Sequence, residues 1–342
     1  MKKEIILSIL IPTYNRVLFL ETGVENLVNQ IKSAGLQLTV EIVIGNDASK
    51  DDTSKYVDEI TTQYDFVRGF NHPKNLGLSQ NIEFLVKEAH GKYILISGDD
   101  DLLRAGAIAY YLQKINEEKP NFILVNTSNI VTTENGNCKF DVILENRLEI
   151  SDNIFVENFE KDRYLLEPTH NWLYLTNFLT AVIFRKDLYE SEMNRAKKYL
   201  RPENVWLWQA PVIIGIKKYG RLLVIANCFV LCRKSDNNWV NDVRGRFYVS
   251  LFDSTEISNL IKDYMPSEYK KYKKYYAFFV MKEFVIATEK GKNIRKSAWS
   301  AFVRNLDCFP ENIQFLSMVI MPNFVANNLP KLKALRKIFK FS

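Results

Sequence analysis

The chain has 342 residues, of which 47% are hydrophobic and 25% charged, a composition typical of a globular protein that buries a core. Its 46 basic and 40 acidic residues leave a net charge of +6, which is too small an excess for a dedicated nucleic-acid-binding protein, so no nucleic-acid partner is expected. The cysteines lack a paired CxxC spacing, which argues against a zinc site and a disulfide framework. No stretch reaches the roughly eighteen apolar residues of a spanning helix, and the apolar N-terminal run breaks at Pro12, so we expect a cytoplasmic protein.

The first 125 residues alternate short apolar runs with segments of helical periodicity. This is the pattern of βαβ units, so we expect an α/β fold with a mainly parallel, Rossmann-like sheet flanked by helices. The expected strands are Ile5–Ile11, Val40–Ile44, Phe66–Phe70, Tyr93–Ser97 and Phe122–Val125. The expected helices between them are Leu18–Ile31, Thr53–Tyr64, Ser79–Ala89 and Ala105–Ile115. Ligands of such sheets bind at the carboxyl ends of the strands, so the polar residues there are the candidate site.

The rest of the chain has a less regular pattern. Residues 126–180 mix polar and aromatic side chains, and we expect them to shape an acceptor side. Beyond them we expect a strand at Ala181–Phe184, a helix at Val205–Lys218 and one or two strands within Arg221–Cys232. Residues 247–264, 267–290, 294–306 and 311–340 have mostly helical patterns. We therefore expect a catalytic domain at 1–243, with halves at 1–125 and 126–243, and a helical C-terminal region at 244–342.

Polar turns follow the first two expected strands. The first is Pro12-Thr13-Tyr14-Asn15-Arg16, which can present backbone N–H groups to a nucleotide or can be an ordinary turn in which Asn15 caps the next helix. Asp47 follows the second strand. Its carboxylate can accept hydrogen bonds from a pyrimidine base, or it can hold a structural turn. Asp51 and Asp52 are expected to cap the helix that begins nearby.

A third turn, residues 71–81, is rich in asparagine and opens a helix. Asn75, Gly77 and Asn81 suit a close approach to ribose or phosphate, because glycine lets a ligand come near the backbone and amides bind hydroxyl and phosphate oxygens. His72 precedes Pro73, and we expect it to be a loop residue and not a base.

Three consecutive carboxylates follow the fourth expected strand. Asp99, Asp100 and Asp101 would repel one another and raise one another's pKa, so a fold that gathers them usually supplies a cation. Oxygen ligands favour Mg²⁺ or Mn²⁺. The alternative is that they cap the helix near Ala105, which accounts for one carboxylate and not for three. We therefore expect a divalent metal at Asp99, Asp100 and Asp101.

Taken together, these motifs resemble those of the family 2 glycosyltransferases, a large inverting family with the GT-A fold. The matching segments, in chain order, are Ile11–Arg16, Asn46–Thr53, Asn75–Asn81 and Gly98–Asp101. The variant "SGDDD" at Ser97–Asp101 is similar to the abequosyltransferase-like branch of bacterial surface-polysaccharide enzymes. The resemblance covers about residues 5–125. Two positions depart from the family's pattern, since Asn46 and Gly98 stand where many relatives have an acidic residue.

The resemblance implies roles for these residues in holding a nucleotide-sugar. Pro12, Tyr14 and Asp47 would hold the base and ribose, with Thr13, Asn15 and the third turn beside them. Asp99, Asp100 or Asp101 would reach the metal that bridges the diphosphate. The implied donor is a UDP- or CDP-sugar.

An inverting transfer also needs a general base for the acceptor hydroxyl. Family members carry it on an acidic pair at the start of a helix after the sheet. Here Glu203 opens the expected helix but Asn204 replaces the second acid. Asp236 and Asp187 are alternatives, and Glu203 could instead be a plain helix cap. Arg233, in a basic and aromatic segment, could clamp a diphosphate or lie in an ordinary surface loop.

The expected function is therefore transfer of a sugar from a nucleotide donor to a hydroxyl of a glycan acceptor, in the synthesis of a bacterial surface polysaccharide. A sugar-1-phosphate nucleotidyltransferase would usually carry a glycine-rich loop after the first strand, and residues 11–16 contain no glycine. A non-catalytic nucleotide-sugar-binding module would keep Asp47 but has no need of Asp99, Asp100 and Asp101.

The C-terminal tail, residues 329–342, is basic and has the pattern of a short amphipathic helix. It contains no acidic residue and the basic residues Lys331, Lys333, Arg336, Lys337 and Lys340. Such a helix can lie on an anionic membrane surface or can dock on the chain's own helical region. The first possibility would place the protein at the inner face of the plasma membrane, where a lipid-linked acceptor is found.

Overall fold

The structure is a computed structural model that describes residues 4–131, 141–143, 148, 150–169, 172–234 and 253–272. The chain divides into two compact units, Met1–Ser235 and Asp236–Ser342. The boundary lies eight residues before the one expected at 243. The candidate site belongs to the first unit.

Up to residue 125 the first unit contains the strands and helices that the sequence predicts, in the predicted order. Its strands are β1 (Leu7–Thr13), β2 (Val40–Asn46), β3 (Val67–Asn71), β4 (Tyr93–Ile96), β5 (Leu102–Leu103), β6 (Phe122–Val131), β7 (Asp141–Ile143), β8 (Ile154–Val156), β9 (Val182–Arg185) and β10 (Leu222–Lys234). Its helices are α1 (Val17–Ser33), α2 (Thr53–Gln63), α3 (Leu78–Glu88), α4 (Ala107–Glu118), α5 (Phe159–Asp162), α6 (Lys186–Ala196) and α7 (Ala210–Tyr219). Three short 3₁₀ segments are η1 (Arg163–Thr169), η2 (Trp172–Asn177) and η3 (Leu179–Ala181).

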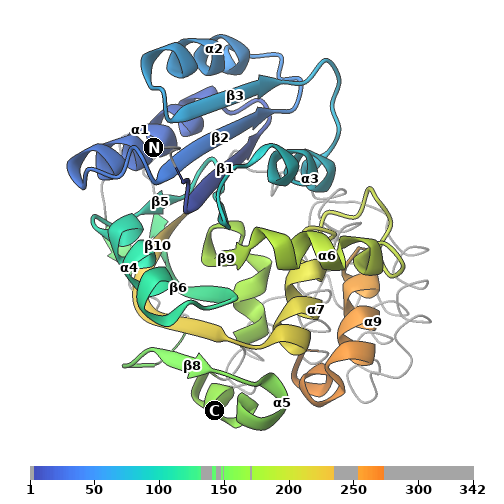
Figure 1. Ribbon diagram of the computed structural model, residues 1–342. Helices are drawn as coiled ribbons and strands as arrows, with labels where there is room; N and C mark the ends of the chain where they lie inside the picture. The colour runs from blue at the N-terminus through green and yellow to red at the C-terminus, as the bar shows by residue number, and fades with distance from the viewer. Residues whose placement is uncertain are drawn as a thin grey trace, which may run out of the picture. The chain divides into compact units, whose positions relative to one another are not determined.

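These strands form one sheet in the order β3-β2-β1-β4-β9-β6-β10-β5, with β7 beside β6 and β8 beside β10. The pairs β3-β2, β2-β1, β1-β4 and β6-β10 are parallel, whereas β9 is antiparallel to both β4 and β6. Six strands of the path, β3, β2, β1, β4, β6 and β10, therefore run in one direction, whereas β9 and the edge strand β5, which is antiparallel to β10, are reversed. Figure 1 shows β3, β2 and β1 side by side, with α2 next to β3. This confirms the mainly parallel sheet.

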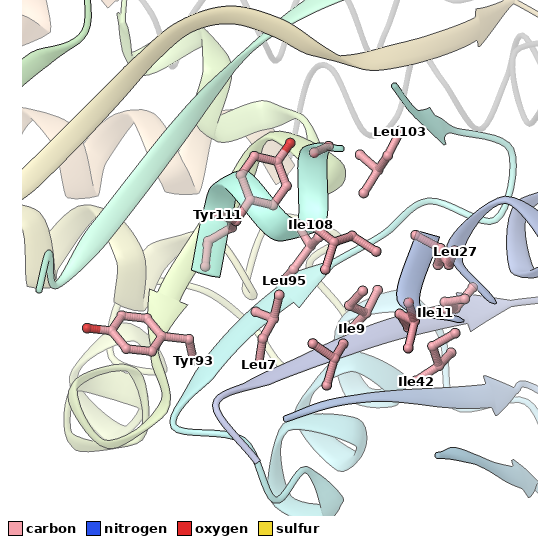
Figure 2. Close-up of a cluster of buried hydrophobic side chains, with 14 of the residues drawn as sticks. Leu7, Ile9, Ile11, Leu27, Ile42, Tyr93, Leu95, Leu103, Ile108 and Tyr111 are labelled. Carbon is pink, nitrogen blue, oxygen red and sulfur yellow. The ribbon is translucent and has the colours of Figure 1, made fainter. Parts of the chain in front are cut away.

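The side-chain alternation of each strand divides the core between two helical layers. Leu7, Ile9 and Ile11 of β1 face one side, where Figure 2 shows them in a cluster with Leu27 of α1 and Ile108 of α4. These apolar groups are at most 2% exposed, so helices α1 and α4 cover this face of the sheet at β1. Removing them from water is the main stabilising contribution of this layer.

Helices α3 and α7 cover the opposite face, and glycines let them come close. A side chain at Gly45 of β2 would collide with Asn81 of α3, and one at Gly215 of α7 would collide with Phe122 of β6. Parallel strands buried on both faces consist of nearly continuous apolar runs, as in β1 and β4. With both faces closed, the edge formed by the strand ends is where polar side chains can gather.

The expected elements up to residue 125 are confirmed within a few residues, and β9 matches the strand expected at Ala181–Phe184. The segment Arg221–Cys232 forms a single strand, β10, with an irregularity between Ile225 and Val230. One helix differs. The helix expected at Val205–Lys218 begins at Ala210, and residues 202–203 and 205–209 form turns.

The described part of the second unit is helical. Helix α9 (Ser254–Tyr264) lies within the first expected C-terminal segment, and residues 266–272 are helical as well. The remaining expected helices and the basic tail lie outside the described residues. Among the residues that the structure describes, no helix is both long enough and apolar enough to cross a bilayer.

Candidate functional site

The polar turns that follow β1, β2 and β4 meet at one edge of the sheet. Because β1 is paired in parallel with β2 on one side and β4 on the other, the carboxyl ends of all three strands lie together. The backbone continues this arrangement past the strands: Asp47 N–H donates to the carbonyl of Thr13 at 2.9 Å, and Ser97 N–H donates to that of Leu10 at 2.8 Å. The turns predicted from the sequence therefore form one continuous surface.

Asp47 joins the second and third turns. Its carboxylate oxygens accept hydrogen bonds from the backbone N–H groups of Leu76 at 2.6 Å and Gly77 at 2.9 Å. The side-chain amide of Asn75 donates to the Asp47 carbonyl at 3.1 Å. Asp47 is only 4% exposed. In this arrangement its carboxylate holds the turn, which is the structural alternative that the sequence left open.

Asn81 lies below this turn and supports it. Its amide donates to the Gly45 carbonyl at 2.8 Å, and its side-chain oxygen lies 3.1 Å from Nε2 of His72. The residue is 1% exposed, so it contributes to the site through the backbone that it holds. His72 is a half-buried loop residue, as the sequence predicts.

The first turn is tied to the second by Asn15. Its backbone N–H donates to Ser49 Oγ at 2.8 Å, and its side-chain oxygen accepts from the backbone N–H of Lys50 at 2.7 Å. Asn15 adopts φ +54°, a left-handed conformation that asparagine tolerates better than most residues. Within the same turn, Tyr14 is 43% exposed, while Pro12 and Thr13 are buried. Tyr14 and Asn15 are thus the exposed residues of this turn.

Asp51 caps two helices at once. It accepts from the backbone N–H of Val17, the first residue of α1, at 3.2 Å and from that of Thr53, the first residue of α2, at 3.2 Å. The expectation that Asp51 is a cap is confirmed. Asp52 occupies the N-cap position of α2 but makes no capping side-chain hydrogen bond.

Asp99 is the most deeply buried of the three consecutive carboxylates. Its two oxygens accept hydrogen bonds from Thr13 Oγ1 at 2.8 Å and from Arg16 Nη1 at 2.6 Å. Burial raises its pKa to about 6, with the Asp100 charge adding to the rise and the Arg16 charge opposing it. Arg16 itself has a raised pKa: although burial lowers it, the charges of Asp99 and Asp100 outweigh that effect.

Asp100 and Asp101 have different partners. Arg16 Nη1 also lies 3.1 Å from Asp100 Oδ2, so one guanidinium bridges two carboxylates. Asp101 accepts a hydrogen bond from Thr180 Oγ1, which in turn accepts from the backbone N–H of Gly98 at 2.9 Å. Thr180 is completely buried in η3. The turn that carries the carboxylates is therefore fastened to the second half of the domain.

These contacts test whether the site suits a divalent cation. Within the described ranges, no three histidine, cysteine, aspartate or glutamate side chains converge on one point. Mg²⁺ is commonly held by one or two carboxylates together with phosphate oxygens of a substrate, and not by a complete protein cage. Asp99 and Asp100 already face one positive charge, that of Arg16. The two carboxylates therefore fit a cation that is held jointly by the protein and by the phosphate oxygens of a substrate. Asp101, expected as a third ligand, is turned to Thr180.

Glu203 lies in the exposed turn before α7 and not on a helix. The neighbouring Asn204 is completely buried, and its carbonyl accepts a hydrogen bond from Ser79 Oγ of α3 at 2.8 Å. Ser79 follows Gly77 by two residues, so this contact ties the Glu203 turn to the Asp47 turn. The idea that Glu203 caps the helix is wrong, because α7 begins seven residues later.

Of the two remaining candidates, the structure describes the backbone of Arg233, and Asp236 lies outside the described residues. Arg233 lies near the end of β10, where its backbone pairs with Ile130 of β6. The structure adds two residues that the sequence did not single out. Arg16 was part of a motif but had no assigned role, and Thr180 lies at the end of the less regular segment 126–180.

A hollow lies at the opposite edge of the sheet, at the amino ends of β1 to β4. Its lining includes Glu41, Arg68, His90 and Lys92. Glu41 accepts hydrogen bonds from Ser8 Oγ and the His90 backbone, both at 2.6 Å, and Arg68 lies 3.3 Å from it. Glu41 and Arg68 therefore pair with each other, which suits a structural role.

Comparison with known proteins identifies relatives among bacterial glycosyltransferases. The chain is 25% identical over 202 residues to the GalNAc(5)-diNAcBac-PP-undecaprenol beta-1,3-glucosyltransferase of Campylobacter jejuni. The aligned segment covers 59% of this chain and 58% of that protein. It is 35% identical over 105 residues to abequosyltransferase RfbV of Salmonella typhimurium, covering 30% and 31%. The matches thus span less than two thirds of either relative.

Solved structures with the GT-A fold resemble this protein. S. aureus TarS 1-349, in complex with UDP-GlcNAc, has a TM-score of 0.57 at 13% identity, covering 93% of this chain and 81% of that one. Mannosyltransferase PcManGT from Pyrobaculum calidifontis, in complex with GDP-Man and Mn²⁺, has a TM-score of 0.51 at 12% identity, covering 94% and 86%. These likenesses confirm the expected fold.

The family model described as glycosyl transferase family 2 matches residues 8–190. The match covers more than half of the chain and includes β1 to β9, the three turns of the site, the consecutive carboxylates and Thr180. It extends well beyond the 5–125 segment that carried the resemblance in the sequence. The chain belongs to glycosyl transferase family 2.

Proposed function

We propose that this protein transfers a sugar from a nucleoside diphosphate-sugar to a hydroxyl of a glycan acceptor, by a metal-assisted displacement that inverts the anomeric centre. The observation that carries the proposal is the convergence of the turns after β1, β2 and β4 at one edge of a family 2 domain, with Asp99 and Asp100 sharing one positive charge there. An anionic diphosphate needs such a place for a cation beside backbone N–H groups.

The donor would lie on the three turns. The exposed ring of Tyr14 can stack on the base or ribose, and the Asn75–Gly77 segment, held by Asp47, can present its backbone to the ribose. Asp100, which is more exposed than Asp99, would hold the divalent cation, with Asp99 behind it. A cation bound there offsets the charge that develops on the leaving diphosphate.

The acceptor hydroxyl must lose a proton as the new bond forms. Glu203 is the proposed general base, because its exposed turn is tied through Asn204 to the first turn of α3. A carboxylate in this role takes the proton as the acceptor oxygen attacks the anomeric carbon, while the diphosphate departs on the opposite side. Asp236 is the alternative base.

The relatives support a role in bacterial surface-polysaccharide synthesis. The Campylobacter protein is named for an acceptor on undecaprenol diphosphate, and the Salmonella protein transfers abequose, so a lipid-linked glycan is the proposed acceptor class. The solved neighbours hold UDP-GlcNAc and GDP-Man. We favour a UDP- or CDP-sugar as donor.

The proposal is tested by measuring nucleotide release from UDP-, CDP-, GDP- and dTDP-sugars, with Mn²⁺ or with EDTA. One donor should release its nucleoside diphosphate in a Mn²⁺-dependent way. Asp100→Asn should lose this activity, while Glu25→Gln, which removes an exposed carboxylate from α1, should keep it. Binding of a donor without turnover, with every acceptor glycan supplied, would favour a binding module. Formation of a nucleotide-sugar from a nucleoside triphosphate and a sugar phosphate would favour a nucleotidyltransferase.

A further inference from the structure

Arg16 occupies the position between the two carboxylates that the proposed cation would serve. It is the N-cap residue of α1, directly after the first turn. A single guanidinium nitrogen, Nη1, lies 2.6 Å from Asp99 Oδ1 and 3.1 Å from Asp100 Oδ2. Its guanidinium carbon lies 5.5 Å from the ring centre of Phe19, one turn along α1. The guanidinium is thus held on two sides.

The surroundings make this positive charge necessary. The side chains of Asp99 and Asp100 are 6% and 18% exposed, so their charges are only weakly screened by water. Two adjacent carboxylates in such a place repel each other unless a cation lies between them. Asp99 also accepts a hydrogen bond from the hydroxyl group of Thr13, which carries no charge. Arg16 therefore compensates the pair in the donor-free protein.

A divalent cation and Arg16 would share the Asp100 carboxylate. Asp100 Oδ2, on the more exposed carboxylate, already lies within ion-pair distance of Nη1. Two cations at one oxygen repel each other strongly where water is excluded. The Arg16 contact with Asp99 is shorter and more buried, so it is the contact that can persist when the one with Asp100 is broken.

We propose that Arg16 is an internal counter-ion of the Asp99–Asp100 pair, which a divalent cation must displace from Asp100 before it can bind there. The proposal rests on the metal site of the proposed function and adds a competing group within the chain. Metal affinity in the absence of nucleotide is then set by the exchange of one cation for another, and it is lower than the two carboxylates alone would give.

The test is a titration of full-length protein with Mn²⁺ at pH 7.5, without nucleotide, followed by calorimetry or by the electron paramagnetic resonance of free Mn²⁺. Arg16→Gln removes the competing charge and should bind Mn²⁺ about tenfold more tightly, the size expected for an ion pair between the exposed and buried limits. Arg16→Lys keeps the charge but loses the planar fork, so its affinity should lie between those of the other two proteins.

Lys32→Gln is the matched control. It removes the same charge from the last turn of the same helix, roughly 24 Å along α1 at 1.5 Å per residue, which exceeds two Debye lengths at physiological salt. Its affinity for Mn²⁺ should equal that of the wild type. A gain in Lys32→Gln equal to that in Arg16→Gln would show a general effect of net charge and would overturn the proposal.

Thermal unfolding provides a second readout that does not require activity. Arg16→Gln should melt at a lower temperature than the wild type in EDTA and should recover with Mn²⁺, because the metal replaces the missing positive charge. If Arg16→Gln folds only with Mn²⁺, the proposal is supported; if it folds under neither condition, Arg16→Lys decides. Equal or weaker Mn²⁺ binding by the variants, or no binding by any of the proteins, overturns it. The donor panel is unaffected by that outcome and tests the proposed function separately.

Discussion

At the scale of single residues, the three consecutive aspartates have three different environments. Asp99 is buried and bonds to Thr13 and Arg16, Asp100 forms a second ion pair with Arg16, and Asp101 is bonded to Thr180. The sequence predicted that these carboxylates lie at a strand end, because a buried strand precedes them. It could not divide the roles among them, since their partners are about eighty residues away in either direction along the chain.

The raised pKa of Asp99 predicts how stability varies with pH. In the folded protein this pKa is about 6, because burial outweighs the charge of Arg16, whereas in the unfolded chain it is about 3.9. Between these values the folded state binds more protons, so the free energy of unfolding falls as the pH rises towards 6 and then levels off. Asp99→Asn removes this titration.

The measurement is urea unfolding of both proteins in EDTA from pH 4.5 to 7.5. The wild type should lose roughly 1–3 kcal/mol relative to Asp99→Asn over that range. Parallel curves, or a wild type that gains stability relative to the variant as the pH rises, would contradict the assignment.

At the scale of elements, η3 fastens the carboxylate turn to the second half of the domain through one hydroxyl. Thr180 Oγ1 accepts from Gly98 N–H and donates to Asp101. Thr180→Val keeps the volume but leaves both partners without their bond, which should cost about 1–3 kcal/mol of stability. It should also weaken Mn²⁺ binding in the presence of nucleotide, because the turn that carries Asp100 loses its anchor.

Thr180→Ser is the control, because it restores the hydroxyl, and it should recover both stability and Mn²⁺ affinity. A purely structural role for Thr180 predicts a different result. In that case Thr180→Val would be less stable but would bind Mn²⁺ as tightly as the wild type at a temperature where it is folded.

The turn before α7 carries the proposed base, Glu203. Replacing this residue should affect turnover and leave donor binding unchanged. Glu203→Gln should keep the donor dissociation constant, because a general base acts in the transition state and contributes little to holding the donor. Its kcat should fall by about 10²–10⁴. Calorimetry of donor binding and steady-state nucleotide release measure the two quantities. An unchanged kcat would move the base to Asp236.

The elements that the sequence predicted well are those with a local cause. The strands up to residue 125 have buried apolar runs, and their helices have one apolar face, so periodicity alone locates them. The predicted start of α7 was wrong because residues 205–209 have helical spacing but lie in turns. In these turns the Trp206 N–H donates a hydrogen bond to the Asn204 side chain at 2.8 Å. Contacts of this kind between Asn204 and Ser79 cannot be read from a local pattern.

At the scale of the whole molecule, the fold follows from pairings that bring distant segments together. Strand β10 lies beside β6 and β5, about a hundred residues earlier in the chain, and β9 enters the sheet between β4 and β6. The four motifs indicated the family because they resemble those of its members and occur in the same order along the chain. The composition of residues 126–180 gave no comparable indication, because η1 to η3 and β8 lack a sustained period.

The basic tail, residues 329–342, leads to a prediction for the full chain. Its five basic residues, each contributing about 1 kcal/mol near an anionic surface, should give weak, salt-sensitive attachment to anionic vesicles. Co-sedimentation with anionic and neutral vesicles compares the full chain with a version that ends at Asn328. Binding should be lost from the shortened version. Equal binding by both, or unfolding of the shortened version, would contradict the membrane role.

The central claim is that the edge formed by β2, β1 and β4 binds a nucleotide and a divalent cation together. Anomalous diffraction at the manganese edge, from crystals soaked with Mn²⁺ and the nucleoside diphosphate that the donor panel identifies, tests it most directly. We predict a single strong peak between the Asp100 carboxylate and the diphosphate, with the base beside Tyr14 and the Asp47 turn. A nucleotide bound elsewhere, such as the hollow at the amino ends of the strands, or a bound nucleotide whose manganese peak lies away from Asp99 and Asp100, would contradict the account.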